Sequence, residues 1–276
     1  MSFTLHRERG MEFSTSDRLP VPHFFSCKLG GAGDYPYSSK YDPDWLQPET
    51  QQRVRRQWET LCDITGFPRG FCLTHQVHGN LIRPVTASDM VLPPLAQVPA
   101  DCDGLCTAEP GVPVGVFSAD CVPVLFCEPE ARIVAAAHCG WKGTALDMAG
   151  SAVAAIRARG GRPEKILAAI GPAISACCFQ VGPEVPEAMV LLLGEADAAP
   201  TFRPQPGAEG KYLLNLKEVN RRRLLQLGVP AENIDVSPDC TMCQSGRYWS
   251  HRATQGRRGT QCNAILLPLP KGGAAL

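Results

Sequence analysis

The chain has 276 residues, which is enough for one large domain with a buried core. Hydrophobic residues make up 44% of it and charged residues 20%, a balance typical of a folded globular protein rather than a disordered one. The 27 basic and 27 acidic residues cancel to a formal net charge of zero, so no electropositive surface for nucleic acid is expected.

Neither a membrane span nor a secretion signal is expected. No apolar run is long enough to cross a bilayer. The first residues, MSFTLHRERGMEF, lack the apolar core of a signal peptide. The 13 cysteines are an odd number with irregular spacing, which argues against a disulfide framework. We therefore expect a cytoplasmic monomer in a reducing compartment, with no membrane or nucleic-acid partner.

The predicted elements alternate between strands and helices along the chain. Residues 1–20 are expected to be loosely ordered, and a short strand then runs into the glycine-rich stretch at 30–33. A helix is predicted to begin at Pro48, because apolar residues follow it at helical spacing. Further strands are predicted at 71–75, within 111–127, at 132–138, at 165–171 and near 261–267, further helices over 146–156, 183–193 and 216–227, and loops over 88–100 and 194–210.

Because strands and helices alternate without a clear linker, both kinds of element should share one core. The expected fold class is α+β, with mixed β-sheets packed with flanking helices in a single layered domain. That domain is expected to span residues 21–270.

Three predicted strands end in a histidine or cysteine beside small residues. They lie in QVHG (76–79), SADCVPVLF (118–126) and AAAHCGWKG (135–143). Strand ends next to glycine turns allow side chains to converge without the backbone blocking access. His78, Cys121 and His138 would together offer two imidazoles and a thiolate, which suit Zn²⁺ and leave a fourth position for a reactant. On spacing alone, a histidine of this kind is more often an ordinary satisfied polar group than a metal ligand.

Six segments in one order resemble a known family. They are QVHG, DGLCT (103–107), ADCVPVLF, HCGWKG, GPAISACCFQVGPEV (171–185) and SHRATQGRRGTQCNAIL (250–266). Together they are similar to the YfiH-like laccase-domain family, also described as polyphenol oxidase-like and as purine nucleoside phosphorylases. The resemblance extends from about residue 22 to 268 and implies a YfiH-like fold. It also implies that His78, Cys121 and His138 bind a catalytic zinc.

The resemblance further implies the reaction. It predicts phosphorolysis of adenosine, inosine, guanosine and methylthioadenosine to the free base and (methylthio)ribose 1-phosphate, with adenosine deamination as a second activity. The partners would be a purine nucleoside and phosphate, and the cofactor Zn²⁺, with Cu²⁺ as the alternative. Two motifs depart from the family pattern: Lys28 stands where an arginine is usual, and His251 follows Ser250 where a tyrosine is usual.

Four residues are candidates for substrate binding. Arg252 is the best cation for phosphate, because a guanidinium matches phosphate geometry, although a surface salt bridge is the simpler interpretation. Lys28 and Lys142 are weaker candidates, since lysine does not replace a planar arginine faithfully. Asp120 precedes the ligand cysteine, and it either orients a histidine ring or caps a turn.

Two other activities stay open. A copper-dependent, laccase-type polyphenol oxidase would also use two histidines and a cysteine, but a multicopper site needs several further imidazoles and the chain has six histidines in all. A cysteine hydrolase would use Cys121 as the nucleophile and His78 or His138 as the base.

The chain also contains two pairs of cysteines close in sequence. Cys240 and Cys243 form a C-x-x-C motif, but no second such motif follows, so packing is the simpler interpretation. Cys177 and Cys178 are adjacent, and on a strand their side chains would point to opposite faces. We therefore expect no metal to be bound by both.

Overall fold

The structure is a computed structural model that describes residues 3–28, 48–92 and 101–270. The glycine-rich stretch predicted at 30–33 and most of the predicted loop at 88–100 lie outside these residues. The helices of the described part are α1 (Pro48–Thr65), α2 (Trp141–Ala145), α3 (Met148–Arg157), α4 (Glu184–Leu193), α5 (Glu195–Ala198), α6 (Leu216–Gln226) and α7 (His251–Thr254), with short 3₁₀ turns at Ala87–Asp89, Pro163–Lys165, Ala199–Thr201 and Ala231–Asn233. Among these residues, no helix combines the length and apolar character that crossing a membrane requires.

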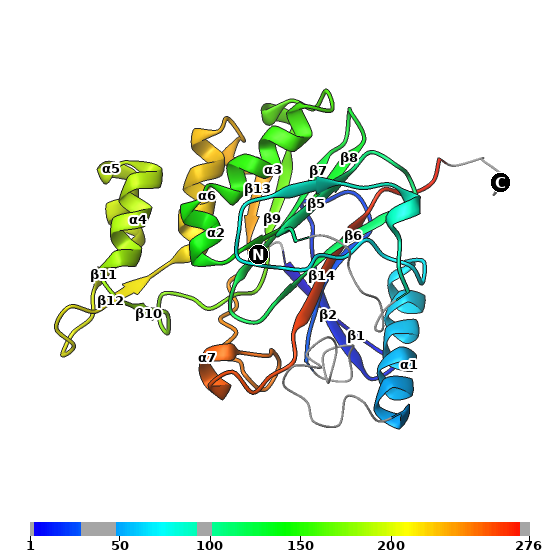
Figure 1. The fold of residues 1–276 in the computed structure, drawn as a ribbon, viewed down its shortest axis with the longest axis horizontal. Coiled ribbons are helices and arrows are strands. Elements are labelled where there is room, and N and C mark those ends of the chain that lie inside the picture. Colours follow the sequence, from blue (N-terminus) through cyan, green and yellow to red (C-terminus); the bar gives the residue numbers. More distant parts are fainter. Residues whose placement is uncertain (1–2, 29–47, 93–100, 271–276) are drawn as a thin grey trace.

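Two large sheets form the body of the molecule (Figure 1). The antiparallel five-stranded sheet has the order β1 (Phe3–Glu8), β2 (Met11–Ser16), β3 (His23–Ser26), β14 (Gln261–Leu266) and β6 (Pro113–Ser118). The mixed six-stranded sheet has the order β13 (Ile234–Val236), β9 (Leu167–Ile170), β7 (Val122–Glu128), β8 (Ile133–Cys139), β5 (Gly104–Thr107) and β4 (Ile82–Pro84). In that sheet β13 runs parallel to β9 and β4 runs parallel to β5.

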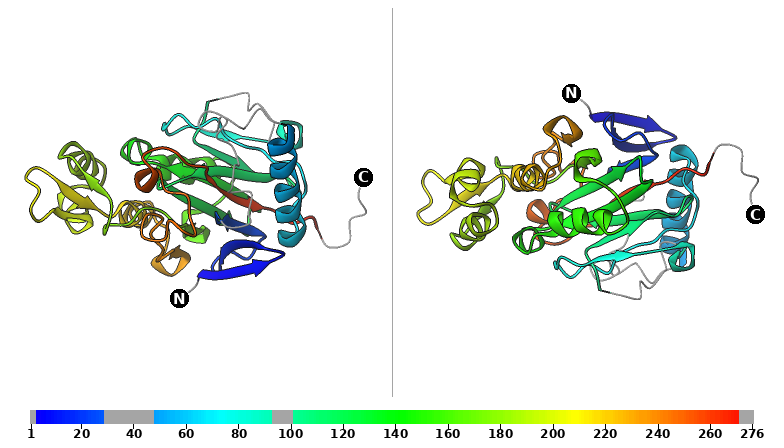
Figure 2. Two further views of the ribbon diagram at one scale, coloured as in Figure 1. Left: turned by 90° about the horizontal axis from the view of Figure 1, so that it is seen from below. Right: turned by 90° about the horizontal axis from the view of Figure 1, so that it is seen from above.

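The six-stranded sheet is buried on both faces, which explains the unbroken apolar runs of its central strands. On β7, Leu125 and Cys127 pack against the five-stranded sheet, whereas Val124 and Phe126 face the core beneath the helices. Helices α3 and α6 contribute to that second core. On the far face of the five-stranded sheet, Trp58 and other residues of α1 complete a third cluster. The layers are therefore helix, sheet, sheet and helices (Figure 2).

A small three-stranded sheet extends this body at one end. It has the order β10 (Gln180–Val181), β12 (Tyr212–Leu214) and β11 (Phe202–Pro204), and it lies with α4 and α5 on the side away from α1 (Figure 1). The predicted α+β class in a single layered domain is confirmed. The excursion predicted at 194–210 contains α5 and β11 rather than loop alone.

Two predictions about local structure are wrong. Residues 3–16, expected to be loosely ordered, form the hairpin β1–β2 of the five-stranded sheet. Residues 71–75 form single bridges, from Phe71 to Val91, from Cys72 to Val114 and from His75 to Asp101, instead of a continuous strand. The hairpin was missed because β1 buries little, so its sequence lacks a clear alternation of apolar residues.

Candidate metal centre

Three side chains that are distant in sequence meet at one end of the six-stranded sheet. His78 lies in the loop before β4, Cys121 in the turn between β6 and β7, and His138 near the end of β8. One ligand atom from each lies within 4.8 Å of the other two. The Sγ atom of Cys121 is 4.0 Å from Nε2 of His78, and the two imidazole rings are nearly perpendicular with centroids 5.0 Å apart. The predicted convergence is therefore confirmed, and the roles of the three residues stay a prediction.

Strand pairing explains why Cys121 and His138 meet. Strands β7 and β8 are antiparallel, with Val122 opposite Cys139 and Pro123 opposite His138. Cys121, one residue before β7, therefore lies beside the end of β8. His138 is buried, Cys121 is half-buried and His78 is exposed, so the centre faces solvent on the side of His78.

The buried carboxylate of Asp103, just before β5, holds both histidines in place. Its Oδ1 atom accepts a hydrogen bond from Nδ1 of His138 at 2.8 Å and from the backbone N–H of His78 at 3.0 Å. Its Oδ2 atom accepts from the backbone N–H groups of Val77 at 3.1 Å and Gly79 at 2.8 Å. The loop closes around the carboxylate with His78 at a φ of +62°, a left-handed conformation that this network sustains. Nε2 of His138 is left free to bind a metal, as in other carboxylate–histidine–metal arrangements.

The carboxylate of Asp120 fixes the turn that carries Cys121, because it is hydrogen-bonded to other protein groups. Its carboxylate accepts hydrogen bonds from the hydroxyl of Thr241 at 2.6 Å, the hydroxyl of Ser250 at 3.1 Å and the backbone N–H of Arg252 at 2.7 Å. Its φ of +86° turns the chain sharply before Cys121. The sequence predicts three alternatives for Asp120, namely substrate binding, orientation of a histidine ring or capping of a turn. The structure gives the orienting role to Asp103, and the contacts of Asp120 favour a positioning role over substrate binding.

The charges of the site favour a thiolate. Burial opposes ionisation of the Cys121 thiol, but the charge and hydrogen bonds of His138 and His78 outweigh it and lower its pKa below the usual value. Burial also opposes the charged form of His138, but Cys121 and Asp103 together raise the pKa of its imidazole. Likewise, burial of Asp103 is outweighed by its hydrogen bonds with His138 and the backbone, which lower the pKa of its carboxyl group. Cys121 is thus prepared to act as an anionic ligand.

Gly140 leaves the space beside all three ligands open. A Cβ atom built at this position would lie 3.0 Å from Cδ2 of His78, 3.2 Å from Sγ of Cys121 and 3.6 Å from Cε1 of His138. Its φ of −63° and ψ of 164° suit any residue, so the requirement for glycine comes from this close approach and not from the backbone.

We expect Gly140→Ala to weaken zinc binding while the fold persists. The added methyl group would force the ligands apart by a few tenths of an ångström, and a misplacement of this kind should lower zinc affinity by about tenfold or more. Titration of Zn²⁺ into metal-free protein measures the effect. Gly246→Ala is the matched control, because a Cβ atom there meets no atom within 4 Å. Equal zinc affinity in the two variants would contradict this account of Gly140.

The three predicted cations occupy different surroundings. Arg252, on α7, donates from both terminal nitrogens to the carbonyl oxygen of Gln180, at 3.0 and 3.1 Å. Lys28 lies 4.5 Å from the ring centroid of Trp249 and donates to the carbonyl oxygen of Ser245 at 3.4 Å. Lys142 is exposed in the first turn of α2, two residues after Gly140. Of the three, Arg252 is joined to the centre, because its backbone N–H donates to Asp120 beside Cys121.

Sequence reasoning missed one group near the centre, the imidazole of His251 in α7. Burial lowers the pKa of His251, and the charges of Arg258, Arg252 and His78 lower it further, whereas that of Asp120 opposes them. Because the charge of His78 acts on His251, a third imidazole lies within electrostatic range of the proposed ligands. The only signal in the sequence was the histidine at 251 where the resembling family carries a tyrosine.

The fold and the site together define an α+β protein with three side chains placed to hold a metal ion where the centre opens to solvent. Residues 22–268 match the family described as "Multi-copper polyphenol oxidoreductase laccase". The chain belongs to this family, as the resemblance had indicated.

Relatives of known name agree with this assignment. The chain is 41% identical to purine nucleoside phosphorylase YlmD of Geobacillus stearothermophilus over 204 residues, 72% of this chain and 73% of that protein. It is 37% identical to adenosine deaminase RL5 from an unknown prokaryotic organism over 150 residues, 54% of this chain and 56% of that protein. The crystal structure of the Bacillus licheniformis hypothetical protein YfiH matches it with a TM-score of 0.80 at 32% identity, covering 95% of this chain and 98% of that one.

Proposed function

We propose that this chain is a zinc-dependent enzyme that cleaves purine nucleosides with phosphate and also deaminates adenosine. The observation that carries the proposal is the convergence of His78, Cys121 and His138 within 4.8 Å. Structural zinc sites use four protein ligands, whereas catalytic ones use three and keep a position for a reactant. Relatives named as a purine nucleoside phosphorylase and an adenosine deaminase supply the substrate class.

The donor atoms fit zinc. Two imidazole nitrogens and a thiolate are ligands that Zn²⁺ prefers, and Asp103 supplies the outer-shell carboxylate that such histidines commonly have. When bound, zinc supplies Lewis-acid chemistry, which polarises a reacting oxygen. The surrounding protein groups would position the three ligands. Asp103 keeps the Nδ1 proton on His138, the loop of His78 fixes that histidine, and the turn at Asp120 fixes Cys121.

Phosphorolysis requires an anion to be held beside the nucleoside. An oxygen of phosphate forms a bond to C1′ of the ribose, the bond from C1′ to the purine nitrogen breaks, and the purine keeps the electron pair and takes up a proton. We propose Arg252 as the main phosphate-binding residue, with Lys28 and Lys142 in support. A guanidinium carries five N–H donors, so Arg252 can contact Gln180 and still donate to an anion.

A direct assay tests the proposal. The zinc-loaded protein is incubated with inosine, and hypoxanthine and ribose 1-phosphate are measured with and without phosphate. We expect both products only when phosphate is present, and we expect inosine and ammonia as further products when adenosine is supplied. Methylthioadenosine and guanosine are tested in the same way. No product from any of the four nucleosides, with a folded and zinc-loaded sample, would overturn the proposal.

One observation favours a second candidate, a cysteine hydrolase. Asp103, His138 and Cys121 form a chain of contacts in which the carboxylate orients the imidazole and the imidazole faces a thiol with a lowered pKa. The two proposals differ in their inhibitors. Loss of activity on zinc chelation, with recovery on zinc addition, supports the first. Activity that survives chelation but not alkylation of Cys121 supports the hydrolase.

The positions of the other histidines disfavour a multicopper oxidase. His6 contacts the hydroxyl of Thr15, and His23 accepts from the backbone of Ser16, both in the five-stranded sheet. His75 is exposed and paired with Asp101. Of the six histidines in the chain, only His251 is left to join the two ligands, which is too few for the several imidazoles of a multicopper centre.

A further inference from the structure

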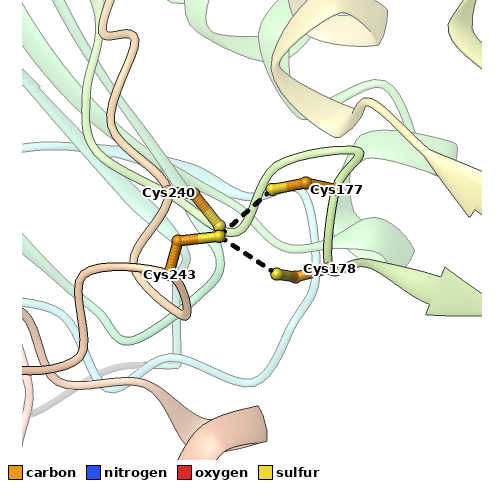
Figure 3. Close-up of side chains that lie close together, drawn as sticks. All are labelled: Cys177, Cys178, Cys240 and Cys243. Atoms are coloured by element: carbon orange, nitrogen blue, oxygen red, sulfur yellow. Dashed lines mark hydrogen bonds between the residues drawn. The ribbon is translucent and has the colours of Figure 1, made fainter.

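Four cysteines outside the proposed active centre gather at one point of the surface. Cys177 and Cys178 come from the turn after β9, and Cys240 and Cys243 from the segment after β13 (Figure 3). The four Sγ atoms all lie within 4.8 Å of one another. Cys243 is in contact with two of them, at 3.4 Å from Cys177 and 3.3 Å from Cys178. Neither cysteine pair takes part in the chemistry proposed above.

The sheet topology explains this meeting. Strands β9 and β13 are parallel neighbours, so the segments that follow them leave the same edge of the sheet. Ala173 and Cys240 form a parallel bridge, and the backbone N–H of Thr241 donates to the carbonyl oxygen of Ala173. The strand that was assumed for Cys177 and Cys178 is not present. They lie in a turn, where adjacent side chains can point to the same side.

We propose that Cys177, Cys178, Cys240 and Cys243 form a second zinc site with a structural role. Four thiolates around one ion are a common structural zinc set, and the C-x-x-C spacing of Cys240 and Cys243 is usual in such sites. With Zn–S bonds of about 2.3 Å, a tetrahedral site separates its sulfur atoms by roughly 3.8 Å. The contacts at 3.3 and 3.4 Å and the limit of 4.8 Å bracket this value.

The surroundings of the cluster suit negative charge. The backbone N–H of Ser175 donates to Sγ of Cys240 at 3.4 Å, and the backbone of Cys243 also contacts this sulfur. The buried ammonium group of Lys217 donates to the carbonyl oxygens of Ser237 and Asp239, and it interacts electrostatically with Cys240 and Cys177. A zinc ion with four thiolates carries a net charge of about −2, which these donors and this cation would stabilise.

A zinc ion here would fix the segment that supports the active centre. Thr241, between the two cysteines of the C-x-x-C motif, donates to Asp120 beside the ligand Cys121. Further along the same segment, Ser250 and Arg252 make the other two contacts with Asp120. The proposed site would therefore tie the segment from 240 to 252 to the turn after β9, and so stabilise the position of Asp120.

Alkylation of the native protein tests the site without any variant. Cys177 and Cys243 are exposed, so as free thiols they should react rapidly with iodoacetamide. The full-length protein is stripped with a chelator under reducing conditions and divided, and Zn²⁺ is returned to one half. Labelling of each cysteine is then measured by peptide mass spectrometry. We expect zinc to slow the labelling of all four cysteines by about tenfold or more, because a thiolate bound to metal is a poor nucleophile.

Two single variants then locate the metal. Cys243→Ser should bind one zinc ion fewer per chain than the wild type and melt at a lower temperature, while zinc at His78, Cys121 and His138 is retained. Cys121→Ser is the reciprocal control: it should leave zinc protection of Cys177 and Cys243 unchanged. The labelling test measures the four cysteines, whereas the nucleoside assay measures the proposed active centre. A failed nucleoside assay would therefore not affect the conclusion about the cysteine site, and a failed labelling test would not affect the conclusion about nucleoside cleavage.

Three results would overturn the proposal. Labelling of Cys177 and Cys243 at equal rates with and without zinc would show that no zinc binds there. Protection that a reductant removes but a chelator does not would indicate a disulfide instead. Equal zinc content in Cys243→Ser and the wild type would place the zinc elsewhere. Should Cys243→Ser fail to fold, the labelling of the wild-type protein still decides.

Discussion

Replacing Cys121 by serine is expected to remove zinc and nucleoside cleavage together. The thiolate is the only anionic ligand among the three, and a serine hydroxyl, which stays protonated near neutral pH, leaves two imidazoles to hold the ion. Loss of an outer-shell partner already costs about 10–100-fold in metal affinity or activity, so loss of this ligand should cost more than about 100-fold. Elemental analysis gives the zinc content, and kcat/KM with inosine and phosphate gives the activity.

Cys139→Ala is the matched control for this variant. Cys139 is also a buried cysteine, one residue after the ligand His138, but its side chain belongs to the core beneath the helices. Its removal should lower the free energy of unfolding and leave zinc binding in place. If Cys121→Ser instead kept full zinc content and full activity in solution, the three-ligand centre would not be the site of the reaction.

Cys121 and His138 were predictable because Cys121 directly precedes the apolar strand β7 and His138 lies near the end of β8, whereas His78 lies in a loop and was indicated by its QVHG motif. QVHG, ADC and HCGW combine a ligand with a neighbouring turn, and such positions point side chains into a common space at the end of a sheet. Pairing of β7 with β8 then brings Cys121 to His138 through the register alone. The layered α+β fold was predictable because β7 and β8 are buried along their whole length and are apolar apart from Glu128 and His138.

The groups that position the ligands could not be assigned from sequence. Asp103 belongs to the quoted DGLCT motif, but its role depends on β5 lying beside β8 and beneath the loop of His78. No sequence signal indicates that contact, because His78 and Asp103 are 25 positions apart in the chain. Asp120 was noted beside Cys121, but its partners Thr241 and Ser250 lie more than a hundred residues further on. Contacts of this kind follow from the topology of the whole sheet.

The four-cysteine cluster could also not be predicted from the sequence. The contacting residues Cys178 and Cys243 are 65 positions apart in the chain, and neither cysteine pair is a complete metal motif. Only the parallel neighbours β9 and β13 bring their following segments together. The sequence did not indicate this convergence because Cys177 and Cys178 were assumed to lie on a strand, and a turn presents adjacent side chains differently.

Asp103→Asn is expected to weaken zinc binding and turnover by about 10–100-fold. An amide keeps one acceptor oxygen and replaces the other by an NH₂ group, whereas four N–H donors surround the native carboxylate. In either orientation of the amide, two of these donors then face another donor. Burial without a partner costs about 1–3 kcal/mol for such a group, so the free energy of unfolding should also fall. Zinc titration, kcat/KM and chemical denaturation measure the three effects.

The comparison with Asp101→Asn separates positioning from stability. Asp101 is exposed and pairs with the exposed His75, so this variant should change neither zinc affinity nor the free energy of unfolding by much. In Asp103→Asn, an NH₂ group that faces Nδ1 of His138 would favour the imidazole tautomer with its proton on Nε2, the nitrogen that must bind the metal. Zinc affinity should therefore fall even at temperatures at which the variant is fully folded. A variant that is less stable but binds zinc as tightly as the wild type would show that Asp103 supports the fold without positioning either His138 or the loop of His78 for the metal.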